Sequence, residues 1–214
     1  MWAEWKVWFE PNSVSSKWVW SWKSWPTVRD DLLINSWMFK FAGISDPTMQ
    51  DRQPWGSWAT FKVYKFKKND EIFFSCQLPH TYKEWTDIRA HIHWTPWDRW
   101  TAESWNSVGW KLDYTRANVR SWTFPSSSTI DLQWVCSWTN DKHEVAHWLT
   151  SEAILDWDWK KISSMLVCRL YRTDTWADDT WVWTSNANSP ALLQFDFHHE
   201  IDSNGSRWER IKEW

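Results

Sequence analysis

Glycine is nearly absent from this chain of 214 residues, which contains only four. In an average soluble protein glycine makes up about 7% of the residues and supplies the backbone conformations that tight turns require. Tryptophan deviates in the opposite direction, with 27 copies. The two counts have to be interpreted together, because many of the tryptophans stand where a turn would favour glycine.

Other features are missing too, and each absence excludes a class of protein. The three cysteines, Cys76, Cys136 and Cys168, are far apart and form no Cys-x-x-Cys pair. We therefore expect buried or half-buried free thiols rather than disulfides or a thiolate zinc site. No apolar stretch approaches the ~18 residues of a membrane span, and the N-terminus lacks the basic start and apolar core of a secretion signal. These absences predict a soluble protein without membrane insertion.

Charge and motifs exclude further functions. The net charge is -3, and lysine and arginine form no sustained stripe, so nucleic acid is not an expected partner. Nucleophile elbows, P-loops and dinucleotide-binding fingerprints are absent, even when glycine is restored at the tryptophan positions. We therefore assign no catalytic residue and no cofactor-binding residue, and we expect a protein that is not an enzyme.

The tryptophans that are present cluster in polar breaks between apolar runs. Residues 54–58, 97–100 and 157–161 are three such breaks, where glycine would be ordinary because it reaches positive φ without a Cβ clash. Trp94 and Trp110 differ, since they fall on the apolar phase of alternating segments. We hypothesise that most of the other tryptophans come from a codon, UGA, that the source reads as glycine. The intact mass of the native protein tests this hypothesis.

The alternation of polar and apolar residues predicts an all-β fold. Residues 1–33 lack sustained periodicity and predict an extended N-terminal arm, whereas residues 34–214 predict one antiparallel β-sandwich of jelly-roll type. Residues 151–155 favour one helical turn, and residues 174–188 favour an exposed loop. Candidate strands cover residues 36–42, 59–67, 71–78, 87–95, 107–115, 129–134, 144–149, 162–172 and 191–202.

Three of these segments alternate clearly enough to assign faces to their residues. One face of each is apolar and is expected to point into the core. The core faces are Ile88, Ala90, Ile92 and Trp94 in the first, Val108, Trp110, Leu112 and Tyr114 in the second, and Leu193, Phe195, Phe197, His199 and Ile201 in the third.

Histidines on the opposite faces form the sharpest candidate site. His91 and His93 alternate on one strand, so both imidazoles project from one face, as metal sites in jelly rolls require. His198 could supply a third ligand for a divalent metal if its strand is a neighbour. The alternative is that these imidazoles are surface groups hydrogen-bonded to carboxylates such as Asp87 and Asp196.

Two motifs bear on metal chemistry. If Trp85 and Trp105 are glycines, the segment around His91, His93 and Asp98 resembles the first cupin motif, with Asp in place of Glu, but the second cupin motif is not found. Residues 143–147 match the H-E-x-x-H pattern of zinc proteases, which needs a helix and a third ligand. The strand-rich surroundings and the missing third ligand argue against a protease.

Several segments carry a resemblance to a known group of proteins. These segments are residues 91–96, 110–114, 117–118, 123–125, 162–172 and 193–206. In their order and their residues they resemble little-characterised β-rich proteins encoded by tailed bacteriophages and viral metagenome contigs. The resemblance covers roughly residues 40–207. The related proteins look glycine-rich at turns where this chain has Trp97, Trp122 and Trp138.

The resemblance implies a virion component, such as a fibre, tail or capsid-decorating protein, assembled in the host cytoplasm. The arm would bind other virion proteins, and the sandwich would face outward in a homo-oligomer and contact a host-surface glycan. Two alternatives remain: a metal-binding, cupin-like jelly roll that uses His91 and His93, and a carbohydrate-binding module if the tryptophans are genuine.

Overall fold

The computed structural model describes most of the chain from residue 28 to residue 202. The described ranges are residues 28–53, 58–96, 107–120, 123–135, 142–146, 153–155, 161–173 and 189–202. None of these residues belongs to an apolar helix of membrane-spanning length. The predicted loop at residues 174–188 and most of the predicted arm lie outside the described residues.

Strands account for nearly all of the regular structure in these ranges, as the alternating sequence predicts. They are β1 (Val28–Ile34), β2 (Thr48–Arg52), β3 (Phe61–Lys65), β4 (Glu71–Gln77), β5 (Ile88–Thr95), β6 (Ser107–Ala117), β7 (Ser128–Val135), β8 (Glu144–Ala146), β9 (Met165–Arg172) and β10 (Ala191–Ile201), with a 3₁₀ turn η1 (Ser36–Met38).

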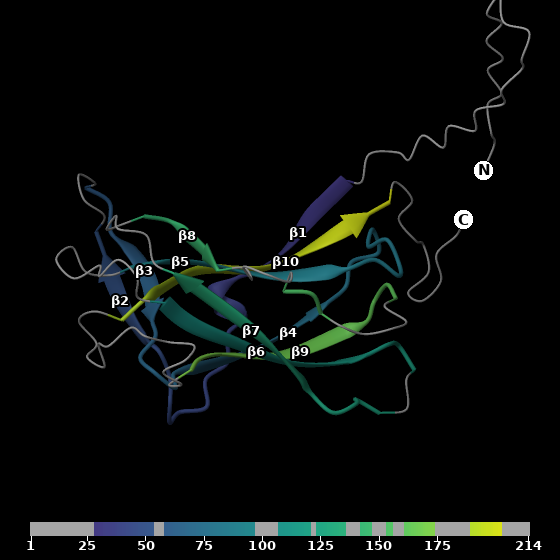
Figure 1. Ribbon diagram of the computed structural model, residues 1–214, viewed down its shortest axis with the longest axis horizontal. Coiled ribbons are helices and arrows are strands. Elements are labelled where there is room, and N and C mark those ends of the chain that lie inside the picture. Colours follow the sequence, from purple (N-terminus) through teal and green to yellow (C-terminus); the bar gives the residue numbers. More distant parts are fainter. Residues whose placement is uncertain are drawn as a thin grey trace, which may run out of the picture.

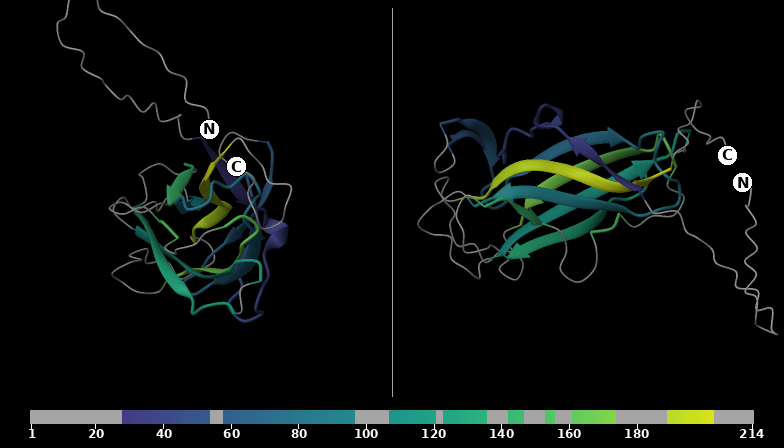
Figure 2. Two further views of the ribbon diagram at one scale, coloured as in Figure 1. Left: turned by 90° about the vertical axis from the view of Figure 1, so that its right-hand side faces the viewer. Right: turned by 90° about the horizontal axis from the view of Figure 1, so that it is seen from above.

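The strands form two antiparallel sheets that pack face to face (Figure 1). The six-stranded sheet has the order β2-β3-β10-β5-β8, and β1 pairs with β10 beyond the end of the β3 pairing. The four-stranded sheet has the order β4-β9-β6-β7. Figure 2 shows the long strands of both layers running along the same axis of the molecule. The fold is thus the predicted all-β sandwich, while jelly-roll connectivity stays a prediction.

One hydrophobic core fills the space between the sheets. The Phe74 ring in β4 lies 5.0 Å from the ring of Phe195 and 6.3 Å from that of Phe197, both in β10 of the opposite sheet. Trp110 packs edge-on against Phe66 at 4.9 Å. Aromatic pairs at these distances add to the free energy gained by removing apolar area from water.

The predicted faces of β5 and β6 are confirmed. All four predicted core residues of β5 are fully buried, and those of β6 are at most 3% exposed. Trp94 and Trp110 are among these buried residues, so both belong to the core as expected. Cys76 and Cys168 are free and buried, also as expected, and burial raises the pKa of the Cys76 thiol to about 12.

The predicted face of β10 needs one correction. A bulge between Leu192 and Gln194 shifts the pairing register with β5. The extra residue turns Leu193 outward, where it is 43% exposed, and Leu192 is buried instead. Alternation cannot reveal a bulge, because one inserted residue reverses the face of every residue on one side of it.

Several predicted elements were wrong. Residues 36–42 form no strand but the turn η1 and a single bridge from Lys40 to Phe73. Residues 153–155 are not helical, since Ile154 forms a bridge with Arg89. Two strands were missed: β2, and β1, which takes up the last residues of the segment predicted as an arm. Both are edge strands with many exposed residues, so neither carries a strong apolar alternation.

Asp70, in the turn between β3 and β4, carries the first testable prediction. Burial raises the pKa of Asp70 to about 6, although the hydrogen bond from the Lys67 amide and the charges of Lys67 and Arg172 oppose this effect. The folded protein therefore holds this proton more tightly than the unfolded chain, where the pKa is about 3.9. The contribution of Asp70 to the free energy of unfolding is therefore complete below about pH 4 and is lost as the pH rises through about 6.

Replacing Asp70 with Asn should therefore stabilise the protein at pH 7, because the amide carries no charge and can still accept the Lys67 hydrogen bond. The gain should shrink below pH 6 and vanish near pH 4. Urea unfolding of both proteins across this pH range measures it. A stability difference that is independent of pH would contradict the assignment.

Candidate functional site: a histidine and aspartate cluster

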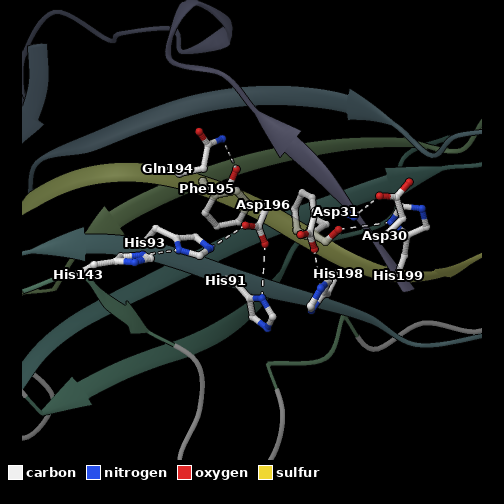
Figure 3. Close-up of polar contacts among 11 residues, drawn as sticks. Asp30, Asp31, His91, His93, His143, Gln194, Phe195, Asp196, His198 and His199 are labelled. Atoms are coloured by element: carbon white, nitrogen blue, oxygen red, sulfur yellow. Dashed lines mark hydrogen bonds and ion pairs between the residues drawn. The ribbon is translucent and has the colours of Figure 1, made fainter. Parts of the chain in front are cut away.

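The outer face of the six-stranded sheet gathers four histidines and two aspartates from four segments (Figure 3). We call this set the imidazole cluster. β5 and β10 are adjacent antiparallel strands, and Asp196 is paired with His91 in register. The strand of His198 is therefore a neighbour of the strand that carries His91 and His93. The cluster consists of His91 and His93 from β5, Asp196 and His198 from β10, Asp31 from β1, and His143 just before β8.

Asp196 is the centre of the cluster. Its side chain is only 4% exposed, and its Oδ2 accepts a hydrogen bond of 2.8 Å from His93 Nε2. Its Oδ1 makes no hydrogen bond within the described part of the chain, and His91 Nδ1 lies 3.5 Å away. Burial alone would raise the pKa of Asp196, but the contacts with His91 and His93 outweigh it and lower the pKa to about 2. Asp196 is therefore an ionised carboxylate at neutral pH.

His93 is held on both sides of its ring. Its Nδ1 lies 2.7 Å from Nε2 of His143, while the hydrogen bond to Asp196, opposed by burial, raises the pKa of His93. A carboxylate only accepts, so Nε2 of His93 carries a proton. In neutral His93 the Nδ1 atom is then the acceptor, and His143 Nε2 donates to it. The result is a chain of hydrogen bonds from the exposed His143 through His93 to buried Asp196.

His198 belongs to the same face but has a different partner. Its Nε2 lies 2.6 Å from Asp31 Oδ1, and its ring contacts the His91 ring at 4.7 Å. The structure thus places His91 and His93 beside Asp196, and His198 beside Asp31. Within the described ranges no group of three or more His, Cys, Asp or Glu side chains is arranged to hold a metal ion. Ligation of one metal by His91, His93 and His198 stays a prediction.

Two cluster members were not foreseen. In the sequence His143 belongs only to the H-E-x-x-H pattern, and Glu144, which follows it, begins a strand. His143 lies near His93 because His93 is paired with Val145, two residues after His143. Asp31 comes from β1, which the sequence did not signal. His147 lies outside the described residues, as do Trp105 and Asp98 of the partial cupin motif.

A serine and histidine pair elsewhere in the described chain serves a different purpose. Ser163 has a positive φ of 60° and its Oγ lies 3.0 Å from His80 Nε2. Ser163 is only 2% exposed, and its backbone amide already donates to Leu78 at 3.0 Å. These contacts tie the turn before β9 to the segment that follows β4.

Comparison with known proteins gives no further guide to the cluster. No family model matches the sequence, and neither does any curated protein. Its chemistry therefore has to be argued from its own geometry.

Proposed function

We propose that this protein is a non-enzymatic structural or adhesive component of a phage particle, in a fibre, in the tail or on the capsid. The rigid sandwich would face outward, and the residues before β1 would bind other particle proteins. A symmetric homo-oligomer and contact with a host glycan are part of the same proposal. The resemblance of the sequence to β-rich phage proteins motivates it.

The attachment of β1 is the observation that carries the proposal. All seven residues of β1 pair with β10, from Val28 opposite Ile201 to Ile34 opposite Phe195. β10 in turn pairs along most of its length with β5, at the centre of the six-stranded sheet. Figure 1 shows β1 and the end of β10 side by side at one end of the molecule. A load applied to the segment before Val28 would therefore pass into a seven-residue ladder and through it into the whole sheet.

Mass spectrometry of purified particles from the native source tests this role. We expect the chain at a fixed copy number per particle, and we expect a variant without residues 1–27 to fold but to be missing from particles. The deletion stops at the start of β1, so it leaves the ladder intact. A chain found only in the particle-free fraction of infected cells would contradict the proposal.

A further inference from the structure

The contact between His93 and His143 places two potential metal ligands together. His93 Nδ1 and His143 Nε2 lie 2.7 Å apart. The ring centroids are 4.9 Å apart, which is close to the greatest separation that this N···N distance allows. The two imidazoles therefore meet head to head, with His143 Nε2 and His93 Nδ1 pointing at each other.

We propose that His93 and His143 together bind one divalent transition-metal ion through His93 Nδ1 and His143 Nε2, with Asp196 as the group that orients His93. Binding of the ion displaces the Nε2 proton of His143, which is released to water. Water completes its coordination on the exposed side of His143. The site differs from the set of His91, His93 and His198, because its second ligand is His143, the residue directly before β8.

An ion bound to both nitrogens requires a tilt of the rings from this head-to-head alignment but little change in the distance between the nitrogens. With metal–nitrogen bonds of about 2.0–2.1 Å, nitrogens at a right angle lie roughly 2.9 Å apart, and nitrogens at a tetrahedral angle lie roughly 3.3 Å apart. The observed 2.7 Å is nearer the first value, which is typical of tetragonal Ni²⁺ and Cu²⁺ sites. His143 is exposed and precedes a strand of only three residues, so its ring has room to tilt, and loss of its Nε2 proton frees the lone pair for the ion.

Asp196 supplies the second, independent observation. A histidine that binds a metal through one nitrogen commonly donates the other N–H to a carboxylate, which fixes the tautomer and the ring orientation. The hydrogen bond of 2.8 Å from His93 Nε2 to Asp196 Oδ2 has this form. It leaves Nδ1 of neutral His93 free of a proton and directed at His143. Asp196 is almost completely buried, and its second oxygen makes no hydrogen bond in the described chain, so its negative charge also favours a cation here.

Calorimetric titration of the full chain with Ni²⁺ tests the site. We expect one site in the wild-type protein, and at least tenfold weaker binding after His143→Ala, a change at an exposed position that should leave folding intact. His93→Ala should weaken binding as much. Asp196→Asn keeps an acceptor but loses the charge, so it should weaken binding by about tenfold. The electron paramagnetic resonance spectrum with Cu²⁺ should show two coordinating imidazole nitrogens, and one fewer after His143→Ala.

His198→Ala is the matched control. His198 lies on the same face and contacts His91, but its Nε2 pairs with Asp31, so its loss should leave the Ni²⁺ affinity within twofold. Equal Ni²⁺ affinity in the wild-type protein and the His143→Ala variant would overturn the proposal. The proposal would also be overturned if His198→Ala weakened binding as much as His143→Ala, since the ion would then not be bound by His93 and His143 alone.

Discussion

Replacing Phe74 with Ala is expected to lower the free energy of unfolding by about 3–5 kcal/mol, the usual loss for a large aromatic residue in a core. Phe74 is 1% exposed and lies between the two sheets. Its ring contacts Phe195 and Phe197 across the sandwich and Phe39 beside it. Removing the ring leaves a cavity at the point where the layers meet, and three aromatic rings lose a partner at once.

Urea unfolding measures this loss, and Val167→Ala provides the control. Val167 is in β9, the neighbour of β4, but it is 42% exposed on the outer face. Truncating it should change stability by only about 0.5 kcal/mol. Similar losses at both positions would mean that the sheets do not pack through Phe74. A much smaller loss at Phe74 would mean that the layers close around the missing ring.

Local periodicity accounts for the part of the fold that could be predicted. In β5 and β6 every second residue is apolar, and the structure buries those residues. Because the side-chain period of a strand is two, this pattern fixes which face is buried without any knowledge of the neighbouring strands. β2 and β1 have no such pattern, since edge strands with exposed residues need little apolar alternation.

The imidazole cluster shows the same limit at the scale of side chains. The shared face of His91 and His93 was predictable because both lie on one strand. From the sequence, contact of these histidines with Asp196 is only one of two alternatives, because it depends on the pairing of β5 with β10, about 100 residues apart. The contact with His143 depends in addition on the short ladder between β5 and β8. A single sequence contains no local signal for either pairing.

The scarcity of glycine leads to the second large prediction, in which one substitution has opposite effects at two tryptophans. Trp94→Gly should destabilise the protein by at least about 4 kcal/mol, because Trp94 is fully buried. Trp85→Gly should stabilise it by about 1 kcal/mol. Trp85 is 52% exposed and has a φ of 72°, in the left-handed region that costs a residue with a Cβ about 1–2 kcal/mol.

Trp85→Ala separates the two possible causes of the gain at Trp85. Alanine removes the indole but keeps the Cβ, so it should not relieve the backbone, whereas glycine should. Gly43, at a φ of 86°, is the reference in this chain for a turn that already has glycine, and Gly43→Ala should cost about 1 kcal/mol. If alanine stabilises as much as glycine at position 85, the backbone there is not strained by its side chain. If only glycine does, this turn has the geometry expected where a tryptophan stands in the place of a glycine.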